Sequence, residues 1–140
     1  MSRLFVYLVV AIFCITKTLA QSESFYFIQL SDPQFGMLEK NKSFSQETMI
    51  MEKVIAAINN LNPAFVVITG DMVNDGKDQK QIDEFKRVCK LIKKSIPVYV
   101  LPGNHDLSQQ CTDESISNYM DEYGYDCFSF QVNNSCFIGL

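Results

Sequence analysis

The chain has 140 residues, a formal net charge of −4 and a single histidine. Nucleic-acid-binding proteins present a basic face, so the acidic balance argues against a nucleic-acid partner. The length fits one small domain. No internal repeats or low-complexity tracts interrupt the sequence.

Residues 1–20 have the pattern of a secretory signal peptide. Arg3 precedes an apolar stretch from Leu4 to Ile15, and Thr18-Leu19-Ala20 stand before the predicted cleavage site. The apolar stretch has about a dozen residues, whereas a membrane span needs roughly 20, so we expect no stable membrane span. An uncleaved anchor is the alternative. The predicted location is secreted, extracellular or in the lumen of the secretory pathway.

Apolar runs alternate with amphipathic helical patterns along the rest of the chain. Aromatic and β-branched runs predict buried strands at residues 25–30, 64–69 and 98–101. Helices are predicted at residues 43–61, with a capping box starting at Ser43, and at residues 78–95 and 112–123. Two further strands are predicted at residues 126–132 and 136–140. This alternation indicates an α/β fold with parallel βαβ units.

A short polar motif follows each of the first three predicted strands. Their sequences are Asp32-Pro33-Gln34, Gly70-Asp71-Met72-Val73-Asn74-Asp75 and Gly103-Asn104-His105-Asp106. Any one of them could be a simple turn, because Asp and Gly are common there. Loops at the carboxyl ends of parallel strands converge, however, and the three motifs together predict metal ligands in one site.

The order of these motifs resembles that of the calcineurin-like metallophosphoesterase superfamily. The first motif has Gln34 where most members have His, and this form is similar to a Ser/Thr phosphatase-like subgroup. The resemblance implies the N-terminal half of an α/β/β/α metallophosphoesterase sandwich. Members of the family carry further histidine motifs downstream. We therefore expect residues 21–140 to be a partial calcineurin-like phosphoesterase domain whose C-terminal half is missing.

The resemblance also implies two divalent metal ions and the residues that bind them. Asp32 and Gln34 would bind the first ion, Asp71 would bridge both, and Asn104 would bind the second. His105 would act as general acid or as a donor to the phosphoryl group, with Asp106 orienting its ring. The ions could be Mn, Mg, Fe or Zn, and an amide in place of an imidazole favours Mn or Mg at the first position.

The predicted function is a metal-dependent phosphoesterase that acts on a phosphate-ester substrate. Two alternatives stay open. One is a truncated, catalytically inactive product with a binding role, and the other is a phosphodiesterase acting on nucleotides or lipid head groups. Neither the substrate nor the oligomeric state follows from the sequence.

A secretory location makes glycans and disulfides chemically accessible. The Asn-x-Ser sequences at Asn41 and Asn133 are predicted glycosylation sites. The four cysteines after the predicted signal peptide allow three pairings. Cys111 and Cys127, on either side of the short acidic helix, are the disulfide candidate, and Cys89 on the apolar side of its helix is expected to be a buried thiol.

Overall fold

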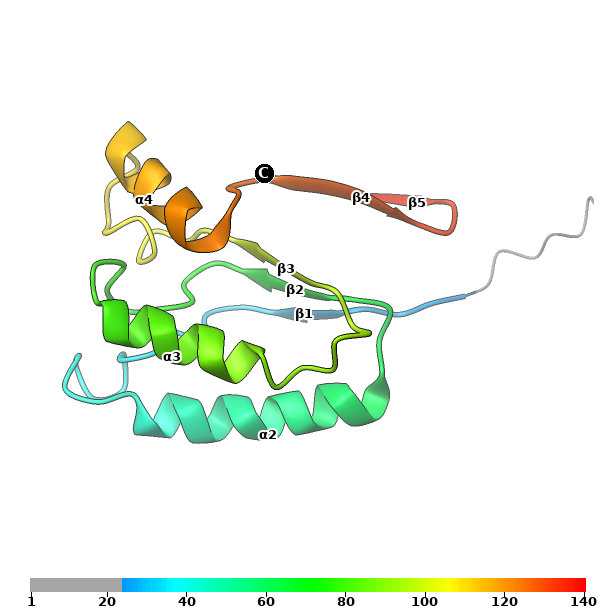
Figure 1. The fold of residues 1–140 in the computed structure, drawn as a ribbon, viewed down its shortest axis with the longest axis horizontal. Coiled ribbons are helices and arrows are strands. Elements are labelled where there is room, and N and C mark those ends of the chain that lie inside the picture. Colours follow the sequence, from blue (N-terminus) through cyan, green and yellow to red (C-terminus); the bar gives the residue numbers. More distant parts are fainter. Residues whose placement is uncertain (1–23) are drawn as a thin grey trace, which may run out of the picture.

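The structure is a computed structural model that describes residues 24–140, and the predicted signal peptide at residues 1–20 lies outside the described residues. A parallel sheet has the strand order β1-β2-β3, and a separate antiparallel hairpin is formed by β4 and β5 (Figure 1). The strands are β1 (Ile28–Leu30), β2 (Val66–Thr69), β3 (Val98–Leu101), β4 (Phe128–Val132) and β5 (Ser135–Gly139). The helices are α2 (Ser45–Leu61), α3 (Gln79–Cys89) and α4 (Asp113–Tyr123).

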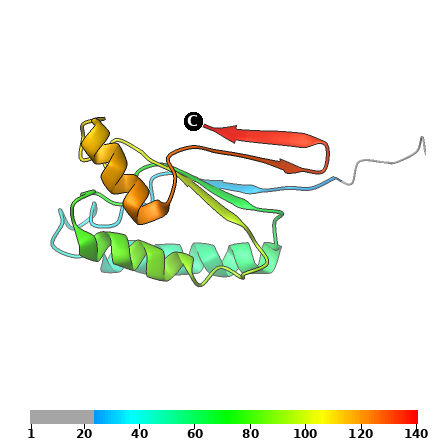
Figure 2. The same ribbon diagram turned by 45° about the horizontal axis from the view of Figure 1, so that its top comes forward.

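Helices α2 and α3 cover one face of the parallel sheet, and the β4–β5 hairpin lies on the opposite face (Figure 2). Each of the two helices connects neighbouring parallel strands, as βαβ units require. The predicted α/β fold with parallel βαβ units is therefore confirmed. The layers are consistent with the N-terminal part of a metallophosphoesterase sandwich.

The main core lies between the parallel sheet and the two covering helices. Helix α2 buries Met51, Ile55 and Ile58, whose spacing of three and four residues places them on one helical face. The corresponding face of α3 contains Ile82, Phe85 and Val88, and β2 between its neighbours is buried along most of its length. Each such side chain contributes about 1.5–3 kcal/mol when fully buried.

Aromatic rings hold the hairpin against the other face of the sheet. Phe65, just before β2, stacks on Phe27 with ring centroids 4.8 Å apart and meets Phe130 edge-on at 4.9 Å. Tyr99 of β3 stacks on Phe130 at 3.9 Å. This second apolar layer explains why the strands of the sheet have large apolar side chains on both faces.

Two helix ends differ from the sequence prediction. The predicted capping box at Ser43 is wrong, because Phe44 is the N-cap residue of α2 and no side chain caps that helix. Helix α3 ends at Cys89 rather than at residue 95. Asn59 of α2 accepts a hydrogen bond from the Lys93 N–H at 2.9 Å and donates one to the Leu91 carbonyl at 2.9 Å. These bonds stabilise turns where the helix was expected to continue.

The predicted Cys111–Cys127 disulfide is wrong for this structure, in which both cysteines are free and exposed. Helix α4 separates them, and its 11 residues span roughly 16 Å at 1.5 Å per residue. A disulfide requires Cα atoms within about 7 Å of each other. Cys89, predicted to be a buried thiol, is partly buried: it packs against the edge of the core, and burial raises the pKa of its thiol to about 12.

Within residues 24–140, none of the helices is both long and apolar enough to cross a membrane.

Candidate metal centre

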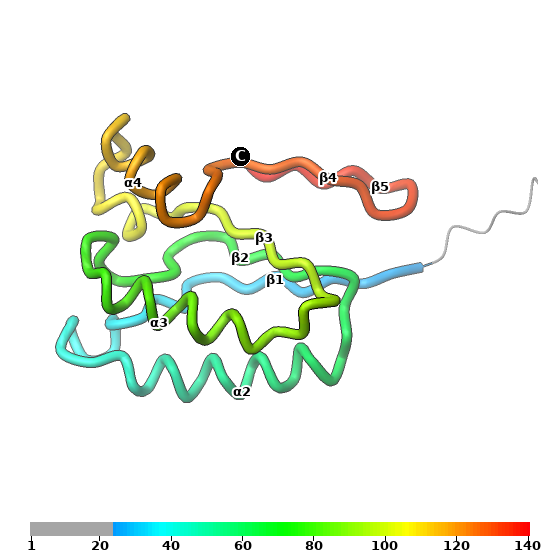
Figure 3. The backbone as a smooth tube through the Cα atoms, viewed as in Figure 1, coloured from blue at the N-terminus to red at the C-terminus, as the bar shows by residue number. Residues whose placement is uncertain are grey.

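The loops after β1, β2 and β3 lie at the same end of the molecule (Figure 3). Backbone hydrogen bonds join the first loop directly to the second. The Asp32 N–H donates to the Gly70 carbonyl at 3.2 Å, and the Gln34 N–H donates to the Asp71 carbonyl at 2.9 Å. A parallel bridge between Phe35 and Val73 continues this pairing beyond the sheet. The first two predicted ligand motifs therefore run side by side.

Asp71 also connects the second loop to the third. Its Oδ1 accepts a hydrogen bond from the His105 N–H at 3.0 Å. The backbone of Gly103 approaches so closely that a Cβ there would lie 2.2 Å from Asp71 Oδ1, far inside van der Waals contact. Only glycine fits at this position. Asp71 thus stands where all three loops meet, as its predicted bridging role requires.

Three of the predicted ligands have left-handed backbone conformations. The φ angles are 55° at Asp32, 40° at Gln34 and 50° at Asp71. This conformation costs an L-residue about 1–2 kcal/mol, less for Asp. Such outliers cluster at functional sites, where the surrounding structure holds them in place.

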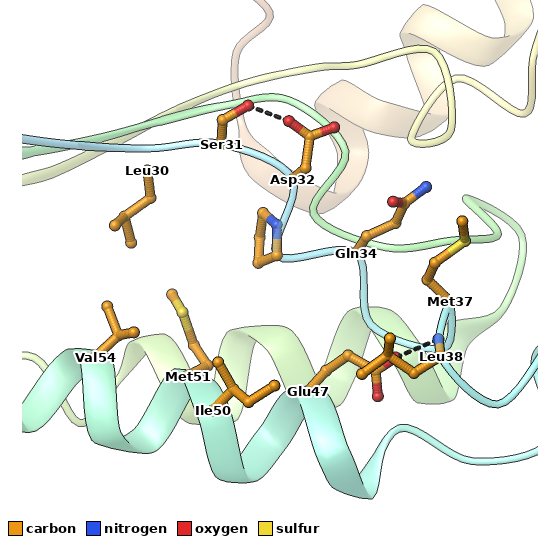
Figure 4. A pocket seen from close by; sticks show the side chains of 11 residues that line it. Leu30, Ser31, Asp32, Gln34, Met37, Leu38, Glu47, Ile50, Met51 and Val54 are labelled. Atoms are coloured by element: carbon orange, nitrogen blue, oxygen red, sulfur yellow. Dashed lines mark hydrogen bonds between the residues drawn. The ribbon is translucent and has the colours of Figure 1, made fainter.

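Asp32 and Gln34 border a cavity of about 400 Å³ whose remaining lining is mainly apolar. Figure 4 shows that the polar ends of both side chains point away from this cavity and that Gln34 turns its amide oxygen to the side of Asp32. The two predicted ligands therefore present their oxygens on one side of the first loop. Across the cavity, the buried Glu47 carboxylate accepts a hydrogen bond from the Leu38 N–H at 2.7 Å.

The predicted orientation of the His105 ring by Asp106 is wrong. His105 Nδ1 lies 2.8 Å from the Asn74 carbonyl oxygen. A carbonyl can only accept, so Nδ1 carries the proton and Nε2 is left for substrate or solvent. The sequence leaves two interpretations of Asn74 open, a side chain facing substrate or metal-bound water and a simple Asn-Asp-Gly turn, and neither predicts this contact of its carbonyl with His105.

Asp106 instead links the second loop to the third. Its buried carboxylate accepts hydrogen bonds from the Gly103 N–H at 2.8 Å and the Val73 N–H at 3.2 Å. Burial raises the pKa of this carboxyl to about 6; the negative charge of Asp71 adds to the shift, and the backbone hydrogen bonds oppose it. Asp106 is therefore buried and holds the second and third loops together through their backbone N–H groups.

The donor set formed by Asp32, Gln34, Asp71 and Asn104 fits a hard divalent cation. The Asn104 Nδ2–H group donates a hydrogen bond to Gln109 Oε1 at 2.8 Å, which leaves the amide oxygen of Asn104 available as a metal ligand. Carboxylate and amide oxygens suit Mg²⁺ and Mn²⁺. Among residues 24–140, no three His, Cys, Asp or Glu side chains come together as a metal site. Two of the four predicted ligands, Gln34 and Asn104, are amides and so fall outside those residue types.

The predicted glycosylation sites lie in different parts of the structure. Asn133 is exposed in the turn between β4 and β5. Asn41 lies on the loop before α2, and its Oδ1 accepts hydrogen bonds from Asn74 Nδ2 at 2.6 Å and Gln81 Nε2 at 3.1 Å. Asn41 and Gln81 therefore belong to the surroundings of the candidate site, although nothing in the sequence pattern indicated it.

The structure is an α/β protein with a three-stranded parallel sheet, and loops with polar side chains follow the carboxyl ends of its strands. The chain belongs to the calcineurin-like phosphoesterase family, whose profile it matches over residues 25–139. It is similar to the rat serine/threonine-protein phosphatase CPPED1, with 34% identity over 131 residues that cover 83% of this chain and 42% of the relative. It is also 32% identical over 112 residues to a probable glycerophosphodiester phosphodiesterase, GpdQ, from Arcobacter nitrofigilis, covering 76% of this chain and 36% of the relative.

A solved structure shares the fold. It is the crystal structure of a dimetal phosphatase from Danio rerio, with a TM-score of 0.57 at 15% identity, covering 80% of this chain and 42% of that chain. The chain therefore spans less than half the length of the relatives that it matches.

Proposed function

We propose that this chain provides the first set of metal-binding loops of a phosphoesterase that hydrolyses phosphate esters at two divalent cations. The observation that supports the proposal is the arrangement around Asp71. Its backbone carbonyl binds the first loop, its carboxylate binds the third, and the close approach of Gly103 leaves no room for a side chain there. Such a junction places residues distant in sequence within reach of one ligand.

The bound cations would neutralise phosphoryl oxygens and lower the pKa of the attacking water. Asp32 and Gln34 would hold one cation, Asn104 the other, and Asp71 would contact both. His105 would exchange a proton through Nε2, a role supported by the contact of its Nδ1 with the Asn74 carbonyl. The leaving oxygen of an ester is the atom that needs this proton.

Two substrate classes are consistent with the relatives. Similarity to a protein named serine/threonine phosphatase favours a phosphomonoester on Ser or Thr. Similarity to a protein named glycerophosphodiester phosphodiesterase supports a phosphodiester as the second candidate. The predicted signal peptide supports a secreted or lumenal location, which detection of the expressed protein in the culture medium, with and without residues 1–20, would test.

The test of the proposed function is hydrolysis of p-nitrophenyl phosphate in the presence of Mn²⁺, with bis(p-nitrophenyl) phosphate as the diester probe. Asp71→Asn keeps the shape of the side chain and removes its charge, and we expect it to abolish turnover. Asp83→Asn, on the exposed side of α3, is the matched control and should retain the wild-type rate. Measurable and equal rates for wild type and Asp71→Asn would refute the proposed site. A wild-type chain that binds Mn²⁺ without turnover would favour the binding role.

A further inference from the structure

We propose that a chain of amide side chains, running from Gln81 through Asn41 and Asn74 to Gln34, determines which atom of Gln34 faces the metal. We call these four residues the amide relay. The inference rests on the proposed metal site and assigns positioning roles to three residues that do not bind the cation. An amide coordinates a hard cation through oxygen, so a ligand amide turned the wrong way presents an NH₂ group that cannot coordinate.

The polarity of the amide relay is fixed at Gln81. This side chain is 1% exposed, and its Oε1 accepts hydrogen bonds from the N–H groups of Asn74 at 3.1 Å and Asp75 at 3.0 Å. Backbone N–H groups can only donate, so the opposite atom of the amide must be nitrogen. That nitrogen lies 3.2 Å from Asp78 Oδ2, a carboxylate oxygen that accepts. Both ends of Gln81 therefore support one orientation.

The orientation of Gln81 is passed on to Gln34 in three contacts. Gln81 Nε2 donates to Asn41 Oδ1 at 3.1 Å, and the same oxygen accepts from Asn74 Nδ2 at 2.6 Å. Because Asn74 uses its nitrogen toward Asn41, it turns its Oδ1 to Gln34 and accepts from Gln34 Nε2 at 3.5 Å, the longest contact of the relay. Gln34 Oε1 is thereby left on the side of Asp32, as Figure 4 shows.

Asn74 connects the relay to His105 as well. Its carbonyl oxygen lies 2.8 Å from His105 Nδ1, while its N–H donates both to Gln81 Oε1 at 3.1 Å and to the Phe35 carbonyl at 3.0 Å. One residue therefore orients both a metal ligand and the ring that exchanges the proton. This makes Asn74 and Gln81 positioning residues for two different parts of the proposed reaction.

The fold makes specific room for the buried Gln81 amide. Gly36 has φ of +100°, and a Cβ at this position would lie 2.6 Å from Gln81 Nε2. A buried amide is costly unless its hydrogen bonds are made, and this amide makes four of them with protein partners. The left-handed glycine therefore leaves room for the buried Gln81 amide, and the two residues together support the first and second loops.

Asn41 is the position at which the amide relay is best tested, because it is exposed and has a left-handed φ of 63°. Gly and Asp both tolerate this backbone conformation. Asn41→Asp keeps an oxygen that accepts from both Asn74 and Gln81, whereas Asn41→Gly removes it. Both changes remove the predicted glycosylation sequence, so they are compared in protein without glycans. Lys40→Asn changes the net charge by the same amount as Asn41→Asp and controls for electrostatics.

The main measurement is the affinity for Mn²⁺ by calorimetry. We expect Asn41→Gly to bind about tenfold more weakly, as is typical when a partner of a metal ligand is removed. Asn41→Asp and Lys40→Asn should stay within about threefold of wild type, because the relay is intact in both. Equal affinities for Asn41→Gly and wild type would overturn the inference.

A second measurement separates this inference from the proposed function. In metal-free protein labelled with ¹⁵N-glutamine, the side-chain amide signal of Gln34 should shift in Asn41→Gly and stay in place in Asn41→Asp. If the wild-type chain binds no Mn²⁺, the proposed metal site fails, and the Gln34 signal still decides whether the relay orients the amide. An unchanged Gln34 signal in Asn41→Gly would overturn the relay.

Discussion

The raised pKa of Asp106 predicts an unusual dependence of stability on pH. Burial moves the pKa of this carboxyl from 3.8 to about 6, so the folded state binds a proton more tightly than the unfolded chain. The resulting stabilisation is fully present below the unfolded pKa of 3.8 and is lost as the pH rises through 6. The total is about 3 kcal/mol, of which about 2 kcal/mol is lost between pH 4.5 and pH 7.5.

The perturbation that isolates this contribution is Asp106→Asn. Asparagine does not titrate, and its amide oxygen can still accept from the Gly103 N–H. Its amide nitrogen then faces the Val73 N–H, which costs about 1–3 kcal/mol at every pH. The free energy of unfolding of the variant therefore differs from that of wild type by a constant amount plus the pH-dependent contribution of Asp106.

Urea unfolding at pH 4.5 and pH 7.5 measures the difference. The chain has no tryptophan and six tyrosines, so tyrosine fluorescence and far-ultraviolet circular dichroism are the signals, with EDTA present to exclude metal. We expect the stability of wild type relative to Asp106→Asn to be about 2 kcal/mol greater at pH 4.5 than at pH 7.5. Asp83→Asn should show no such change relative to wild type. If the difference in free energy of unfolding between wild type and Asp106→Asn is the same at both pH values, the raised pKa of Asp106 is refuted.

Three further predictions concern single positions. Gly103→Ala should destabilise the fold by at least about 1–3 kcal/mol in urea unfolding and abolish Mn²⁺ binding, because its Cβ would meet Asp71 Oδ1 at 2.2 Å; unchanged stability would contradict this contact. Thr112→Ala removes the hydrogen bond from the Ser115 N–H that caps α4 and should cost about 1 kcal/mol in the same assay, and no loss would argue against the cap. The Cys89 thiol should resist a disulfide reagent at pH 8 until urea is added, as mass spectrometry can establish, because burial raises its pKa to about 12; fast labelling in the folded protein would contradict its burial.

The parts of the structure that the sequence predicts are those that depend on local pattern. Strands β1, β2 and β3 were predicted from short apolar runs, and the polar motifs after them from their position at strand ends. Parallel pairing then brings the loops together without any knowledge of side-chain contacts. For this reason the fold class and the convergence of the three loops could be predicted.

The errors arise where a distant residue overrides the local pattern. Helix α3 stops early because Asn59, on the preceding helix, binds the backbone of Leu91 and Lys93. The family resemblance implies that Asp106 orients His105, but its carboxylate accepts hydrogen bonds from Val73 and Gly103 instead. Helical and strand periodicity contain no information about such long-range polar contacts.

The predicted ligands and their supports differ in one physical respect. Asp32 and Asn104 are exposed, and Gln34 and Asp71 are only partly buried, whereas Asp106 and Gln81 beneath them are buried and make hydrogen bonds to backbone N–H groups. Partly hydrated ligands keep oxygens available for a cation, and buried supports keep loops in a strained conformation that exposed residues could not hold alone. The loops of the candidate site are therefore held by residues that are not predicted to bind the metal. Substitutions of those residues should lower metal affinity even where the ligands themselves are intact.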